Sequence, residues 1–224
     1  MIKGKQIYHI LFKDQKLIFT VIPKNANTSV KHILLNYIYP HILKIVDYKH
    51  VTTFHSSTLK YFEFVDNKFC YENTDYLKIT IVRNPFDRLV SGWNDKIRTL
   101  NVNNKKHKPR FGFPQACTFE QFIKQIYDIE EENINRHFIP QYRFITYNDT
   151  LFSNKILRFE DLNNQWNDLV YELKRTHNIK LNKMDINLNN TNRKKHYREY
   201  YNKELIKLVE EKFEKDLNMF NYQF

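Results

Sequence analysis

Short apolar runs alternate along the chain with stretches in which apolar residues recur every three or four positions. The runs "LIFTVI" (17–22), "LKITIV" (77–82) and "KILRFE" (155–160) have the length and β-branched content of buried strands. Each run is followed by a segment with helical spacing. Strands that alternate with helices predict an α/β fold with a central parallel sheet flanked by helices.

Local signals indicate where several helices begin. A helix is expected from about Thr28 and another from Pro85, because proline suits the first helical turn. A third extends through "WNDLVYEL" (166–173), and Glu160 and Asp161 are expected to cap it.

The second half of the chain adds two helices. Thr118 and Gln121 have the spacing of a capping box, and 202–220 has the pattern of one closing amphipathic helix. The stretch 101–117 is the clear long loop. Because no repeat or linker interrupts the chain, we expect a single domain over residues 1–224.

Composition narrows the choice of partner. The formal net charge is +11, which favours an anionic partner such as a nucleotide, a nucleic acid or an acidic glycan.

Cys70 and Cys117 are too few for a disulfide scaffold and lack zinc spacing, so both are expected to be reduced packing residues. Charged residues interrupt the first 19 positions. We therefore expect a soluble, cytoplasmic protein without an integral membrane segment.

The turn "PKNANTS" (23–29) has the layout of a phosphate-binding loop without glycine. It lies between a predicted strand and a predicted helix, whose N-terminal N–H groups and dipole attract anions. Asparagine tolerates left-handed backbone, so 25–27 are expected to make the turn. An ordinary turn with Thr28 as N-cap explains the pattern equally well. The candidate ligands are Lys24, Asn25, Ala26, Asn27, Thr28 and Ser29.

A second turn, "VRNPFDRLVS" (82–91), follows the next strand. Arg83 leaves the strand end and Ser91 lies two helical turns further on, so that both can face one anionic group. Two further cations, Arg88 and Lys96, are expected to be solvated or paired with the neighbouring acids Asp87 and Asp95.

At these two turns the chain resembles the PAPS-dependent sulfotransferases, in particular the carbohydrate branch that includes the chondroitin enzymes. (PAPS is 3′-phosphoadenosine-5′-phosphosulfate.) The family pattern P-K-x-A-x-T-x-x-K is matched at 23–31, and V-R-x-P-F-x-R-L-V-S at 82–91. Three shorter stretches match in the same order: "HFIPQ" (137–141), "FEDL" (159–162) and "DLNMFNY" (216–222).

The resemblance implies a three-layer P-loop-like fold and PAPS as co-substrate, with no metal. It assigns the 5′-phosphosulfate to the loop 24–29 and the 3′-phosphate to Arg83 and Ser91, with Lys24 at the leaving oxygen. The expected partner is a carbohydrate or another hydroxyl acceptor, and not a nucleic acid.

The resemblance also suggests a base and a closing segment. In relatives a histidine or glutamate after the second strand takes the acceptor proton, which leaves His50 and His55 as candidates here. His137 is an acceptor contact or a structural histidine. Arg193 and Lys194, in the basic run 192–201, are expected near the 3′-phosphate or on a solvated face.

Three other interpretations are open. A P-loop nucleotide kinase requires the G-x-x-x-x-G-K-[ST] loop and a metal-binding acid, which the sequence lacks. A basic protein that binds nucleic acid or another anionic polymer is permitted by the charge, although no recognition motif is present. An inactive sulfotransferase fold is the third.

Overall fold

The computed structural model describes residues 7, 9–38, 63–98, 111–114, 117–184 and 195–224. They form two compact units, each described here by itself. We call them the sheet unit, of Ile7–Val82 and Phe144–Asn190, and the helical unit, of Arg83–Arg143 and Thr191–Phe224. The single domain over residues 1–224 stays a prediction.

A five-stranded sheet forms the centre of the sheet unit, in the order β3-β1-β2-β4-β7. Its strands are β1 (His9–Phe12), β2 (Leu17–Thr20), β3 (Glu63–Val65), β4 (Leu77–Val82) and β7 (Lys155–Arg158). The pairs β2–β4 and β4–β7 are parallel. The predicted α/β class, with helices on a central sheet, is confirmed.

Two strands of this sheet, β1 and β3, were not predicted. β1 pairs antiparallel with β2 and with β3, so the sheet is mixed at one side. The β1–β2 hairpin closes through a turn in which Lys16 has a φ of 47° and its N–H donates to the carbonyl of Lys13.

The predicted strand ends and the helix cap need small corrections. β2 ends at Thr20, and after β7 the chain forms a short 3-10 helix, Phe159–Asp161. Asp161 stands before α7 (Leu162–Thr176), but its side chain makes no backbone cap. Its carboxylate instead accepts hydrogen bonds from the side chains of Asn164 and Gln165.

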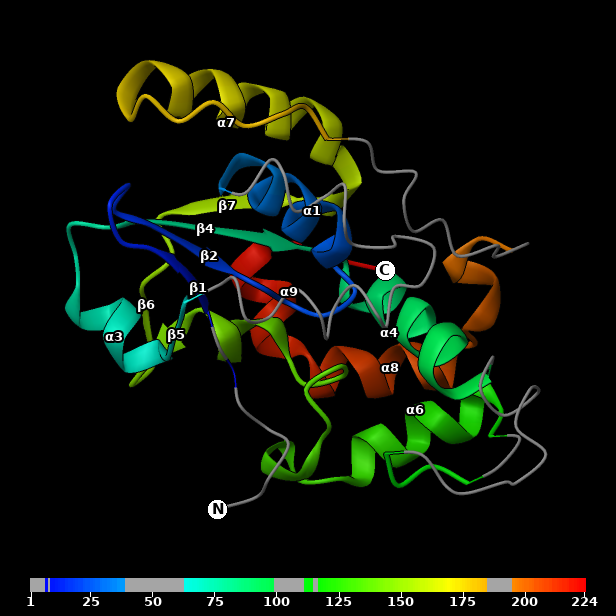
Figure 1. Cartoon of the computed structure of the whole chain (residues 1–224). Helices are drawn as coiled ribbons and strands as arrows, with labels where there is room; N and C mark the ends of the chain where they lie inside the picture. The colour runs from blue at the N-terminus through cyan, green and yellow to red at the C-terminus, as the bar shows by residue number, and fades with distance from the viewer. Residues whose placement is uncertain (1–6, 8, 39–62, 99–110, 115–116, 185–194) are drawn as a thin grey trace. The chain divides into compact units, whose positions relative to one another are not determined.

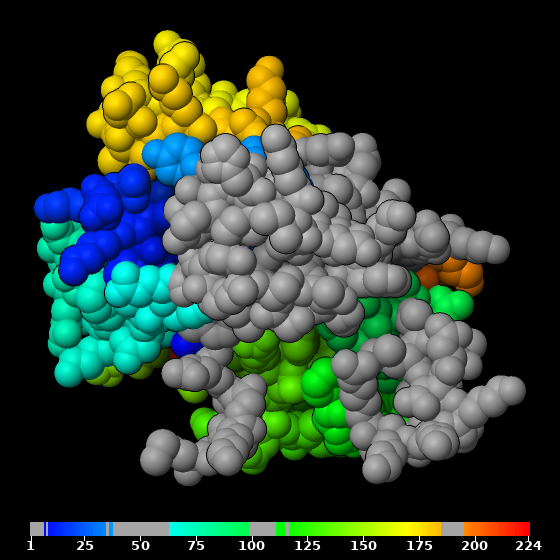
Figure 2. Space-filling view, viewed as in Figure 1, coloured from blue at the N-terminus to red at the C-terminus, as the bar shows by residue number. Residues whose placement is uncertain are grey.

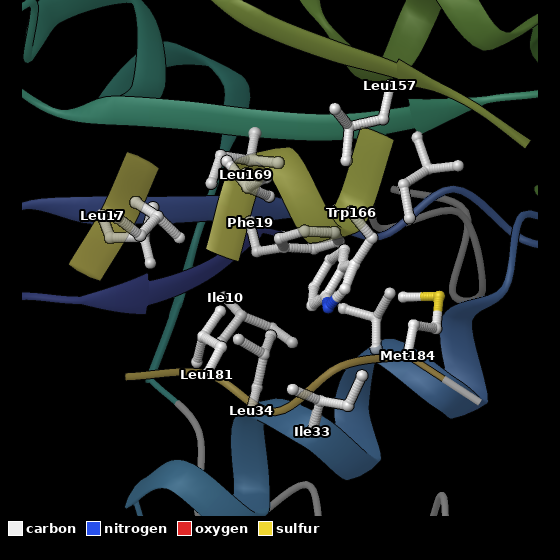
Figure 3. Packing of buried hydrophobic residues seen from close by; sticks show 14 of the residues in the cluster. Ile10, Leu17, Phe19, Ile33, Leu34, Leu157, Trp166, Leu169, Leu181 and Met184 are labelled. Atoms are coloured by element: carbon white, nitrogen blue, oxygen red, sulfur yellow. The ribbon is translucent and has the colours of Figure 1, made fainter. Parts of the chain in front are cut away.

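The hydrophobic core of the sheet unit lies where α1 (Asn27–Ile38) and α7 cover one face of the sheet (Figure 1). Phe19 of β2 meets Trp166 of α7 edge to face, with ring centroids 6.3 Å apart (Figure 3). Trp166 also donates its indole N–H to the carbonyl of Asn182. Its buried ring therefore has both apolar contacts and a partner for its polar atom.

One histidine of the sheet unit, His9, is buried beside α3 (Asn67–Glu72). The Nε2 of His9 lies 3.1 Å from the Oδ1 of Asn67, and its Nδ1 lies 2.9 Å from the Oγ1 of Thr20. Asn67 donates through Nδ2 to the carbonyl of Thr146, in β5 (Thr146–Tyr147), which pairs with β6 (Thr150–Leu151). In Figure 2, α3 lies beside the N-terminal strand segment. Burial lowers the pKa of His9 to about 4, so the imidazole is neutral.

The helical unit contains α4 (Pro85–Trp93), α6 (Phe119–Asp128), α8 (Lys203–Lys212) and α9 (Glu214–Phe220). A π-helical turn, Asn94–Arg98, continues α4, and 3-10 turns occur at Glu131–Asn133, from Gln141 and at Tyr197–Tyr200. Pro85 is at the first position of α4, as predicted. The capping box of Thr118 and Gln121 is also confirmed.

The predicted closing helix over 202–220 is two helices. Phe213 lies between α8 and α9 with φ −113° and ψ 21°, outside helical geometry. The break accompanies burial: Phe213, Asp216 and Phe220 all lie inside the helical unit.

Gly92 of α4 is required by a close approach. A Cβ added to it would lie 2.8 Å from Cε1 of Phe138. The Phe138 ring is itself buried against the rings of Phe113 and Phe122, so it has little room to move. Among the described residues, no helix is both long and apolar enough to cross a membrane.

The pKa of His9 predicts a pH-dependent stability. The unfolded chain takes up a proton near pH 6.5, whereas folded His9 does so only near pH 4. The contribution of neutral His9 is therefore complete above pH 6.5 and is lost as the pH falls toward 4. We expect the free energy of unfolding of the wild type, relative to His9→Gln, to fall by about 3 kcal/mol across this window in urea titrations.

Comparison with His9→Gln is needed because Asp216 has the opposite effect on how the free energy of unfolding changes with pH. Its pKa is raised to about 6, so its contribution weakens as the pH rises from 3.8 to 6. Both proteins share that contribution, and the difference isolates His9. A difference that does not change with pH would show that His9 is not held neutral.

Candidate functional site

The loop between β2 and α1 is a tight turn. Its backbone closes through a hydrogen bond of 3.3 Å from the N–H of Asn25 to the carbonyl of Ile22. The carbonyl of Ala26 accepts from the N–H of Val30 at 3.0 Å, so the helical bonding starts there. α1 begins at Asn27, which makes Thr28 a residue of the first turn and not the N-cap.

The left-handed residues of this loop are Lys24, with φ 73°, and Ala26, with φ 56°. The prediction that the asparagines take the left-handed backbone is therefore wrong. Each such residue costs about 1–2 kcal/mol when it carries a Cβ. Backbone strain of this kind is concentrated at functional sites.

The alternation of these two residues has a chemical consequence. Asn25, between them, is not among the residues with positive φ. Alternating backbone handedness turns successive N–H groups toward one side, which forms a concavity that binds anions. The positive end of α1 follows directly and adds to the attraction.

Asn25 contributes an anchor. Its side chain is buried, and Nδ2 donates to the carbonyl of Ile81 at 2.8 Å. Ile81 is next to the last residue of β4, the strand parallel to β2. The bond thus ties the loop to the end of the neighbouring strand. Among the other loop residues, Ser29 is buried and Thr28 is half-buried.

Arg83 is the residue after Val82 and belongs to the helical unit. Hydrogen bonds hold both its side chain and its backbone. Its Nε and Nη2 donate to Oδ2 of Asp87 at 2.9 and 2.8 Å. Its backbone N–H donates to Oε1 of Gln141, and its carbonyl accepts from Nε2 of Gln141. Arg83 is buried and belongs to the same unit as Ser91, a buried residue of α4.

Arg88 departs from its prediction. It is 1% exposed and donates to the carbonyls of Ile139 and His137, at 2.8 and 3.3 Å. Burial lowers its pKa to about 10, while the charge of Asp216 acts to raise it. It is therefore not solvated, and Asp87 pairs with Arg83. The second predicted pair, Lys96 with Asp95, is present at 3.0 Å.

His137 is in a hydrogen-bonded setting. Its Nδ1 lies 2.7 Å from Oδ1 of Asn135, and the same oxygen accepts its backbone N–H. The imidazole also lies beside the ring of Phe111. These contacts are those of a structural histidine, and a contact with the acceptor stays a prediction.

Four predicted residues lie outside the part of the chain that the structure describes: His50, His55, Arg193 and Lys194. The choice of base and the role of the basic run thus stay predictions. Cys70 and Cys117 are buried thiols, as expected, and burial raises the pKa of Cys70 to about 12. No cluster of three metal-ligating side chains is found among the described residues.

Sequence reasoning assigned no role to two buried polar residues, Gln141 and Asp216, and expected Arg88 to be solvated or paired, whereas it is buried. All lie in stretches that match family motifs, and that membership is the signal that was available. Their bonds span long sequence separations, so local spacing does not reveal them.

The fold and the two turns lead to a class of protein. The chain belongs to the sulfotransferase family, which matches residues 8–223. Over 146 residues it is 24% identical to carbohydrate sulfotransferase 14 of Mus musculus. That match covers 60% of this chain and 38% of the relative, so the chain corresponds to well under half of the relative's length. No solved structure matches significantly. The resemblance inferred from the sequence motifs is confirmed.

Asn25 gives a direct test of the loop. We expect Asn25→Asp to lower the free energy of unfolding by about 1–3 kcal/mol, because an oxygen then faces the Ile81 carbonyl where an N–H donated. Asn27→Asp is the matched control, since it adds the same charge at the first residue of α1, where an acid is favourable. Urea unfolding of both variants is the measurement. Equal losses would contradict the anchoring role of the Asn25 side chain.

Proposed function

We propose that the protein transfers the sulfuryl group from PAPS to a hydroxyl group of an acceptor, and that the acceptor is a carbohydrate. Membership of the sulfotransferase family supports the reaction, and the carbohydrate sulfotransferase relative supports the acceptor class. The observation that carries the proposal is the glycine-free loop, in which Lys24 and Ala26 adopt left-handed backbone directly before α1.

In this proposal the chain supplies charge and position. Lys24 and the backbone N–H groups of 26–29 neutralise the leaving 5′-phosphate while the S–O bond to it breaks. Arg83 and Ser91 hold the 3′-phosphate. The S–O bond to the acceptor forms in line, and His50 or His55 takes the hydroxyl proton. The cytoplasmic location stays a prediction.

The nucleotide site is tested by calorimetric titration with adenosine 3′,5′-bisphosphate, AMP and ATP. We expect a dissociation constant for the bisphosphate on the order of micromolar, which corresponds to about 8 kcal/mol of binding free energy, and weaker binding of AMP. Arg83→Ala should abolish the preference for the 3′-phosphate. Lys96→Ala is the control, because it removes a cation of the same unit that pairs with Asp95. A wild type without that preference would overturn the proposal and favour the anionic-polymer alternative.

Lys24 is tested by its effect on turnover. We expect Lys24→Met to slow sulfuryl transfer from radiolabelled PAPS to chondroitin by about 10²–10³-fold, as for a lost transition-state donor. The hydrolysis of PAPS without an acceptor can be measured instead, with the same expected loss. Lys16→Met is a matched control, because Lys16 is also a left-handed lysine of the sheet unit, exposed and paired with Asp75. Equal rates for Lys24→Met and the wild type would remove Lys24 from the mechanism.

A further inference from the structure

The backbone of Arg83 is bonded as if a further strand lay beside it. Its N–H donates to Oε1 of Gln141 at 3.0 Å, and its carbonyl accepts from Nε2 of Gln141 at 2.8 Å. A neighbouring strand supplies the same pair of donor and acceptor. One side-chain amide thus fixes both polar groups of Arg83 directly after β4 ends at Val82.

Gln141 is fixed in turn by Asp216 of α9. Oδ2 of Asp216 accepts from the backbone N–H of Gln141 at 2.7 Å and from its Nε2 at 3.3 Å. Oδ1 accepts from the N–H of Tyr142 at 2.8 Å. Gln141 and Asp216 are both 0% exposed.

These bonds permit one orientation of the Gln141 amide. Nε2 has two acceptors, the Arg83 carbonyl and the Asp216 carboxylate, while Oε1 has the Arg83 N–H as donor. A flipped amide would direct its oxygen at two other oxygens and its NH₂ at an N–H. The orientation of Gln141 is therefore determined by its partners.

The charge of the buried Asp216 carboxylate is compensated by groups around it. Burial raises the pKa of Asp216, and the two backbone N–H groups and the charge of Arg88 act in the opposite direction. Arg88 binds the carbonyls of His137 and Ile139, in the segment that ends at Gln141. The segment 137–142 is thus held to α4 and to α9 within the helical unit.

We propose that Gln141 and Asp216 are positioning residues for Arg83. Gln141 sets the peptide groups of Arg83, Asp216 sets Gln141, and together they fix the direction in which the Arg83 side chain leaves the backbone. Asp87 then holds the guanidinium itself. This inference rests on the proposed function, in which Arg83 binds the 3′-phosphate.

The test measures how much the 3′-phosphate adds to binding. Dissociation constants for AMP and for adenosine 3′,5′-bisphosphate are determined for the wild type, Gln141→Met and Gln141→Glu. Gln141→Glu keeps the shape but places a carboxylate against Asp216 and the Arg83 carbonyl. We expect the preference for the bisphosphate to fall by about tenfold or more, the scale of a lost charge-assisted hydrogen bond, while AMP binding changes little.

Val209→Ala separates positioning from stability. Val209 is buried in α8 of the same unit, so the variant lowers the unfolding temperature without removing a contact to Arg83. We expect it to keep the full preference for the bisphosphate. Should the Gln141 variants not fold, Asp216→Asn, which keeps the shape of the carboxylate, serves instead with the same expected loss.

The outcomes distinguish the two proposals. A wild type that shows no preference for the bisphosphate overturns the proposed function, and this inference with it. A preference that is lost in Arg83→Ala but kept in the folded Gln141 or Asp216 variants overturns this inference alone. A similar loss of preference in Val209→Ala also overturns it, because the effect is then one of general stability.

Discussion

The parallel pairing of β2 with β4 is the constraint on which both candidate turns depend. The register sets Thr20 opposite Thr80, so the two strands end at the same edge of the sheet. The glycine-free loop begins just after β2, and the bond from Asn25 to the carbonyl of Ile81 ties it to the end of β4. Arg83 follows β4 in the chain. In α/β sheets this carboxyl edge is where ligands bind, so the sheet places the start of both turns before any side-chain chemistry is considered.

A loop without glycine can take this shape because its strain is offset locally. The left-handed backbone of Ala26 is accompanied by a helical bond from Val30 to its carbonyl and by packing of its methyl group against the core. Lys24 carries its positive charge on a left-handed residue, within the turn. In the nucleotide loop G-x-x-x-x-G-K-[ST] the lysine follows the turn and glycine supplies the unusual backbone. Here one residue supplies both the unusual backbone and the charge.

The sequence predicted what local signals determine. β4, the start of α4 and the capping box of α6 follow from short apolar runs, a proline and a Thr–Gln spacing. β1 was missed because its four residues, in a stretch that Lys5, Lys13 and Asp14 interrupt, become a strand only through their partners. The break at Phe213 and the burial of Arg88 likewise depend on contacts from remote segments. Residue preferences favoured asparagine for left-handed backbone, whereas tertiary bonding gave that backbone to Lys24 and used Asn25 as an anchor.

Buried primary amides connect both candidate turns to segments remote in the sequence. Asn25 donates to the carbonyl of Ile81 in the sheet unit, and Gln141 donates to the carbonyl of Arg83 in the helical unit. A primary amide satisfies a buried carbonyl without introducing a charge, whereas a lysine or arginine there would add a cation that needs a counterion. The bonds that shape the turns therefore add no cation of their own. The charge of Lys24 in the sheet unit and that of Arg83 in the helical unit are then independent of the amide bonds that hold each backbone in place.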